Sequence, residues 1–139
     1  MRPTRFDLDT VLLPVNFVLR KYREPENDYE PVSEIAKEKD VGVIVMKAFA
    51  KGPWPPPIAD KPSGKRPYSA WYEPFDGQED IDRCLWFAIS QDVTTVASAC
   101  DVRLVPRITN AAERWHELIS EEKEQITESA KNLKPLFLR

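Results

Sequence analysis

One stretch decides the fold that we expect: Val41-Gly-Val-Ile-Val-Met-Lys-Ala-Phe-Ala-Lys-Gly-Pro-Trp54. Its first five residues, 41–45, are apolar and mostly β-branched, without polar alternation. This pattern is typical of a strand buried on both faces of a parallel sheet. The stretch then turns polar at Lys47 and reaches Gly52-Pro53. Because α/β folds place ligands at the carboxyl ends of parallel strands, this loop is the first candidate for a binding site.

Two further strands are expected on either side of this one. Residues 9–16 contain three consecutive apolar residues and then Pro14, which suits a strand end, and Asn16-Phe17 begins the expected exit loop. Residues 92–97 are short and β-branched. Apolar spacing and capping residues predict helices over 31–39, over about 77–89, from Pro106 to Leu118, and after Ser120.

This alternation predicts an α/β fold with parallel strands near 10–15, 41–46 and 93–97, adjacent in that order, and helices on one face. Both edges of so small a sheet are open. We therefore expect the chain to self-associate or to be unstable alone, with apolar side chains such as Val43 and Val45 exposed on an inner face.

Residues 50–78 form a long loop rich in proline and aromatic residues. A loop of this length is usually a lid, a binding loop or disordered, and the aromatic residues argue against disorder. Two interpretations stay open: the aromatic side chains pack the loop against the rest of the molecule, or they contact a substrate.

Composition excludes several classes of function. The chain has 139 residues, a net charge of −3 and a pI near 5.3, so nothing in it suggests binding to nucleic acid or to an anionic membrane. We expect no membrane span, because no apolar run approaches ~20 residues, and no signal peptide, because residues 1–7 lack an apolar core. Cys84 and Cys100 have neither metal nor redox spacing, and His116 is the only histidine, so we expect no metal site and no Cys-His or Ser-His catalysis. A cytoplasmic location follows from the free thiols.

The strands and their order resemble part of a known family. Residues 9–17, 41–52 and 93–100 look like strands six, seven and eight of the aldo/keto reductase barrel, in the branch that carries a Met-Lys pair as Met46-Lys47 does. The stretch Trp86-Phe-Ala-Ile-Ser-Gln-Asp-Val-Thr-Thr-Val96 is similar to the family's passage from helix seven to strand eight. Together these matches cover most of residues 6–119.

The resemblance implies a fold and an activity. Residues 1–139 would be the C-terminal part of a (β/α)8 TIM barrel that reduces a small-molecule carbonyl substrate with NADPH, and residues 50–78 an inserted loop. The family's catalytic Asp, Tyr, Lys and His lie on earlier strands, so we expect no catalytic residue in this chain. Its partner would be the missing N-terminal half of the barrel, or a second copy of the chain.

The resemblance also implies part of a cofactor site. The residues carried over, position by position, are Asn16, Met46, Lys47, Ser98, Arg103, Arg107 and Asn110. Two positions depart from the family: Leu12 replaces a glutamine that contacts the carboxamide, and Ser98-Ala-Cys-Asp101 replaces the usual turn. Arg107, with Arg103 as the alternative, is expected to bind the adenosine 2′-phosphate of NADPH.

A second hypothesis comes from a different class. The chain could be a non-catalytic protein-interaction module that uses the Trp- and Pro-rich loop as its binding surface.

Overall fold

The main sheet of the protein has three parallel strands. The computed structural model describes residues 7–137, with β1 (Thr10–Pro14), β2 (Gly42–Met46) and β5 (Thr95–Val96) adjacent in the order β1-β2-β5. Leu12 lies opposite Ile44, and Ile44 lies opposite Thr95. The predicted strand order and parallel direction are confirmed.

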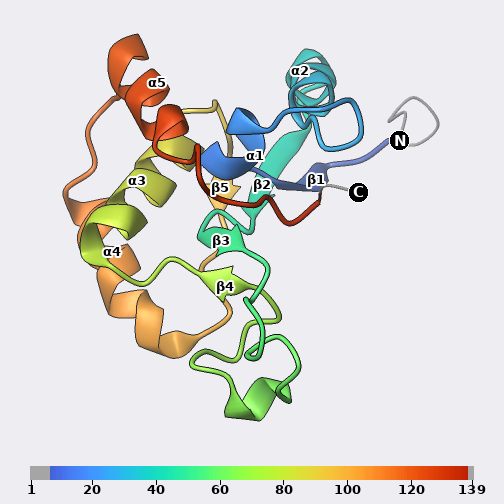
Figure 1. Ribbon diagram of the computed structural model, residues 1–139. Coiled ribbons are helices and arrows are strands. Elements are labelled where there is room, and N and C mark those ends of the chain that lie inside the picture. The colour runs from blue at the N-terminus through green and yellow to red at the C-terminus, as the bar shows by residue number, and fades with distance from the viewer. Residues whose placement is uncertain (1–6, 138–139) are drawn as a thin grey trace.

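Helices connect the strands and cover the sheet. They are α1 (Phe17–Lys21), α2 (Glu30–Glu38), α3 (Gln78–Ile89), α4 (Val105–Glu113) and α5 (Ser120–Glu128). Figure 1 shows α3, α4 and α5 grouped at the left of the molecule and α2 at the upper right, next to β1 and β2. The overall class is therefore mixed α/β.

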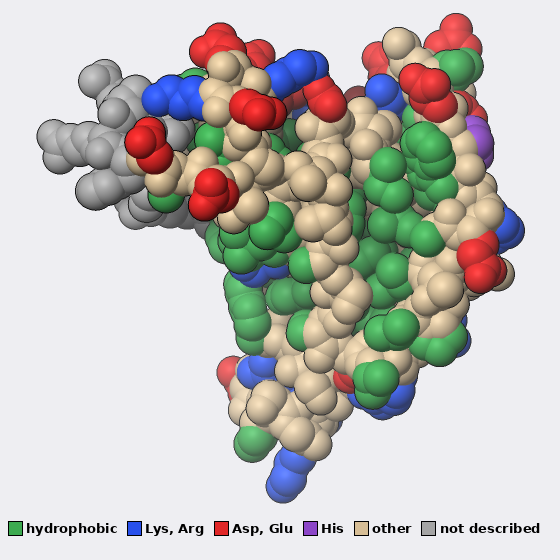
Figure 2. Space-filling view, turned by 180° about the vertical axis from the view of Figure 1, so that it is seen from behind, with side chains coloured by type: hydrophobic (Ala, Val, Ile, Leu, Met, Phe, Trp, Pro, Cys, Tyr) green, Lys and Arg blue, Asp and Glu red, His purple; other side chains and the backbone are tan. Residues whose placement is uncertain are grey.

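Only one face of the sheet is covered. Val43 and Val45 are 5% and 0% exposed and belong to the core with Phe17 and Phe87, whereas Leu12 is 52% exposed. Successive side chains of a strand point to opposite faces, so covering one face with helices buries alternate residues. The prediction that residues 41–45 are buried on both faces was wrong, and so was the prediction that Val43 and Val45 are exposed. Figure 2 shows that hydrophobic side chains gather in a hollow on the back of the molecule, with charged groups around it.

The residues after β1 form a helix where an exit loop was expected. Phe17, Val18 and Leu19 are buried in α1, and this burial explains why the chain coils here. Helix α1 packs against α5, and the Tyr22 hydroxyl donates a hydrogen bond to the Lys131 carbonyl oxygen at 2.6 Å. The segment after β1 and the segment around α5 are thus held together.

Several predicted boundaries differ from the structure. Helix α4 ends at Glu113 and not at Leu118, so the buried side chain of Leu118 belongs to an irregular segment after the helix. Ser120 begins α5 but does not cap it: the Glu122 carboxylate accepts the N–H of Ile119 at 2.9 Å, which lowers the pKa of Glu122. Strand β5 starts only at Thr95.

The proline-rich loop, residues 50–78, has a defined structure. It is closed by a two-stranded antiparallel sheet of β3 (Ala50–Gly52) and β4 (Glu73–Pro74) and contains one 3-10 turn, Ser63–Lys65. Three of its aromatic side chains are buried, namely Trp54, Tyr72 and Phe75, while Trp71 is 56% exposed. Most of the aromatic surface therefore packs the loop against the molecule.

The carboxyl-terminal tail returns to this loop. It runs from α5 across the middle of the molecule (Figure 1). Leu136 packs against the small cluster of Ala50, Ala70 and Tyr72. A Cβ added to Gly52 would lie 2.5 Å from the carbonyl oxygen of Lys134, so only glycine lets the tail approach this closely.

Candidate functional site

Asn16 joins the ends of β1 and β2. It is 2% exposed, and its Oδ1 accepts the N–H of Leu19 at 2.8 Å, which caps α1. Its Nδ2 donates to the carbonyl oxygen of Lys47 at 3.0 Å. Both ends of the amide are therefore engaged in holding the carboxyl edge of the sheet, where a cofactor contact was predicted.

Lys47 follows β2 in a left-handed backbone conformation, with φ 56°. Its carbonyl oxygen also accepts the N–H of Ala50 at 3.1 Å, so two hydrogen bonds hold this turn. The Lys47 ammonium lies 3.3 Å from the sulfur of Met46 and 5.7 Å and 5.3 Å from the ring centroids of Trp71 and Phe137. Distances below about 6 Å are those of cation–π contacts. The Lys47 ammonium thus lies between the Met46 sulfur and two aromatic rings.

The loop places Trp71 through its own hydrogen bonds. The Trp54 indole N–H donates to the Ala70 carbonyl oxygen at 2.9 Å, inside the loop. The Arg66 guanidinium donates to carbonyl oxygens across the loop, at 2.8 Å to Ala59 and 2.9 Å to Lys61. The segment that carries Trp71 is consequently fixed although its surface is exposed.

The residues after β5 form a second polar group. Asp101 is 5% exposed, and its carboxylate accepts two hydrogen bonds from the Arg103 guanidinium, at 2.9 and 2.7 Å, and one from the N–H of Ser69 at 3.0 Å. These bonds, the Arg103 side chain first, hold the pKa of Asp101 well below its usual range. Arg103 also donates to the Pro67 carbonyl oxygen at 2.7 Å. Arg103 therefore joins the proline-rich loop to the end of β5, and three of its five guanidinium N–H donors are already used.

The remaining predicted residues lie on α4 or on the exposed stretch just after β5. Arg107 is exposed, and within residues 7–137 its guanidinium makes no hydrogen bond or ion pair. The Asn110 side-chain oxygen accepts the Arg114 Nε–H at 3.0 Å. Ser98 is exposed, and its hydroxyl donates to the Ala99 carbonyl oxygen at 3.2 Å.

The predicted residues therefore fall into two groups. Asn16, Met46 and Lys47 lie together at the ends of β1 and β2, and the others follow β5. Trp71 and Phe137, which contact Lys47, were not predicted. The density of aromatic residues in the proline-rich loop was the only sequence signal for Trp71, and no local pattern points to Phe137.

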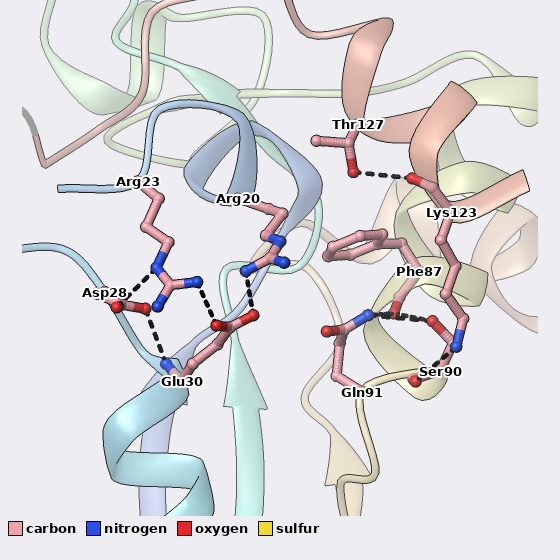
Figure 3. A network of polar contacts seen from close by, with 9 residues as sticks. All are labelled: Arg20, Arg23, Asp28, Glu30, Phe87, Ser90, Gln91, Lys123 and Thr127. Carbon is pink, nitrogen blue, oxygen red and sulfur yellow. Dashed lines mark hydrogen bonds and ion pairs between the residues drawn. The ribbon is translucent and has the colours of Figure 1, made fainter. Parts of the chain in front are cut away.

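A cavity lies elsewhere in the molecule. It measures about 400 Å³ between α1, α3 and α5, and none of the predicted residues lines it. Its wall includes Arg20, Phe87, Gln91, Lys123 and Thr127. Figure 3 shows these residues beside an ion-pair network in which the Arg20 guanidinium turns toward a carboxylate, that of Glu30. Because Arg20 is already neutralised, this cavity offers no free positive charge from it.

Histidine and cysteine form no further centre. His116 is exposed, with Nε2 3.4 Å from the Glu122 carboxylate and its ring against Trp86. Cys84 is buried, and burial raises the pKa of its thiol; Cys100 is exposed, 3.8 Å from the Tyr72 hydroxyl. In the part of the chain that the structure describes, no group of three His, Cys, Asp or Glu side chains could hold a metal ion.

Comparison with known proteins identifies no relative: no family model, curated protein or solved structure matches the chain. Among the helices of residues 7–137, none combines the length and the apolar character that crossing a membrane requires.

Proposed function

We propose that the chain is the C-terminal part of an aldo/keto reductase-like oxidoreductase, which reduces a small carbonyl compound with NADPH. In this proposal barrel strands six to eight correspond to β1, β2 and β5, and a separate segment supplies the catalytic residues. The observation that carries it is the parallel sheet β1-β2-β5 with helices on one face and apolar side chains on the uncovered face.

The uncovered face of the sheet is compatible with the inside of a barrel. The inside of a (β/α)8 barrel is filled by side chains that point inward from every strand, in layers to which alternate strands contribute. On the uncovered face, Leu12, Ile44 and Thr95 are aligned across the three strands, and Pro14 lies opposite Met46 in the next row. Such rows are suited to packing against the strands of the missing half, which would also pair with the open edges of β1 and β5.

The cofactor assignment rests on the residues that follow the strands. Barrels commonly bind phosphate in the loops after strands seven and eight, near a helix N-terminus. Arg107 lies in the first turn of α4 with an unpaired guanidinium among the described residues, whereas Arg103 is held by Asp101. Of the two arginines, Arg107 is therefore the better candidate for the adenosine 2′-phosphate. Met46, at the end of β2 on the uncovered face, suits the nicotinamide end.

The alternative, an interaction module built on residues 50–78, has less support. Trp54, Tyr72 and Phe75 are buried against the chain itself, so Trp71 is the main aromatic side chain that the loop offers to a protein partner.

The test is a chimera that joins residues 7–137 to the first five βα units of a characterised aldo/keto reductase. We expect a monomer that binds NADPH and reduces aldehydes, whereas the chain alone oxidises no NADPH. Arg107→Ala should weaken NADPH binding roughly tenfold and leave NADH binding nearly unchanged, because one charged hydrogen bond contributes about 1.5–3 kcal/mol. Arg83→Ala on α3, which removes an ion pair with Asp80, is the matched control.

Two results would contradict the proposal. A folded, monomeric chimera without NADPH binding would exclude the cofactor assignment. Turnover by the chain alone would show that its own residues carry the chemistry.

A further inference from the structure

We propose that Lys47, Trp71 and Phe137 form a binding site for an aromatic monocarboxylate. Three separate segments supply these side chains: the end of β2, the proline-rich loop and the carboxyl-terminal tail. Their convergence on one ammonium group is a tertiary feature that packing of the sheet does not require.

Among residues 7–137, no anionic group pairs with the Lys47 ammonium. Lys47 is half-buried. The neighbouring Lys51, in contrast, is paired with the Glu73 carboxylate at 2.6 Å. A cation that is partly removed from water and that no described residue neutralises favours the binding of an anion.

The backbone holds this lysine at an energetic cost. A non-glycine residue with positive φ is uncommon, and such conformations persist where the surrounding structure imposes them. Here the amide of Asn16 and the N–H of Ala50 fix the Lys47 carbonyl oxygen. The ammonium is therefore held at the edge of the uncovered apolar face, beside the sulfur of Met46.

The surroundings of the charge select the ligand. Trp71 is 56% and Phe137 37% exposed, so both rings leave flat apolar surface next to the ammonium. A carboxylate on the Lys47 ammonium would place an attached aromatic ring against these faces, where stacked or edge-to-face contacts stabilise it. Phosphate fits less well, since it is usually held by an arginine fork or by several backbone N–H groups. If the chain belongs to the oxidoreductase proposed above, the ligand would be a substrate, an aromatic acid that carries a carbonyl group. Only this identification of the ligand as a substrate rests on the proposed function.

The test observes the tryptophan indole N–H signals by NMR in the full chain, without cofactor. The chain has four tryptophans, and Trp71→Phe identifies the signal of Trp71. Benzoate should shift this signal and leave that of Trp115, which is 42% exposed at a distant position in the sequence, unchanged. Benzyl alcohol, which lacks the charge, and acetate, which lacks the ring, should each bind at least about tenfold more weakly.

Variants separate charge from folding. Lys47→Met should weaken benzoate binding at least about tenfold, Lys47→Arg should retain it, and Lys65→Met in the proline-rich loop should have no effect. The proposal is overturned if Lys47→Met binds benzoate as well as the unchanged chain, if phosphate competes as tightly as benzoate, or if Trp71 and Trp115 respond alike. Because this experiment contains no NADPH, a negative result would overturn the benzoate site without testing the cofactor proposal, which the chimera tests separately.

Discussion

Replacing Asn16 by alanine should lower the free energy of unfolding by more than the loss of one hydrogen bond would. The side chain is 2% exposed and makes two hydrogen bonds, one that caps α1 and one to the carbonyl oxygen of Lys47. Loss of a helix cap costs about 1 kcal/mol. Loss of the second bond costs about 1 kcal/mol more. The Lys47 carbonyl oxygen keeps the N–H of Ala50, so no larger penalty applies there.

The expected change in the free energy of unfolding is therefore about 2 kcal/mol, measured by urea denaturation with an unchanged slope. Asn16→Ser keeps an acceptor for the cap but cannot reach Lys47, and it should lose about half as much. Asn27 supplies a matched control: its amide also accepts one backbone N–H, of Glu24 at 2.9 Å, and donates to one carbonyl, of Tyr22 at 3.1 Å, in a partly exposed loop. Asn27→Ala should therefore cost well under half as much. If Asn16→Ala costs no more than Asn27→Ala, the reasoning is refuted.

Three further changes test other parts of the structure. Gly52→Ala places a Cβ 2.5 Å from the carbonyl oxygen of Lys134, so the tail must move, and limited proteolysis should cut it faster; an unchanged rate would contradict the packing. Lys47→Gly removes the cost of a left-handed conformation, about 1–2 kcal/mol, but glycine loses more conformational entropy on folding, which costs about 0.5–1 kcal/mol. Urea denaturation should therefore show a small gain in stability, and benzoate binding should be lost. Hydrogen bonds from Arg103 lower the pKa of Asp101, so the ionised carboxylate stabilises the fold above the unfolded-state pKa of about 3.9, and this stabilisation is lost as the pH falls below that value. The melting temperature of Asp101→Asn should therefore depend less on pH in this range than that of the unchanged protein. Equal slopes for the two proteins would exclude this account.

The arrangement of the main sheet was predictable because its signals are local. Apolar, β-branched runs mark β1, β2 and β5, and the helical patterns between them require parallel strands. The burial of each face was not predictable. Leu12 and Val43 are both apolar strand residues, yet one is 52% and the other 5% exposed, because tertiary structure decides which face the helices cover.

The candidate site also has parts that could be predicted from the sequence and parts that could not. The positions of Asn16 and Lys47 follow from the strand ends, so their approach could be expected from the sequence. The contact of Lys47 with Phe137 could not, since it depends on a tail that returns to the sheet from the far end of the chain. The pairing of Arg103 with Asp101, two residues away, was visible as a charge pattern, but a free arginine would have given the same pattern.

The packing of α1 against α5 has a consequence during synthesis. Lys21 and Glu128 form an ion pair across 107 residues of sequence, and the buried side chains of α1 are finally enclosed only when α5 has been made. Because a ribosome adds about 5–20 residues per second, the interval between the two helices is roughly 5–20 s. Throughout it Phe17, Val18 and Leu19 form an apolar segment on a nascent chain, open to chaperones and to other nascent chains. Slower translation between α1 and α5 would lengthen this exposure and lower the yield of folded protein.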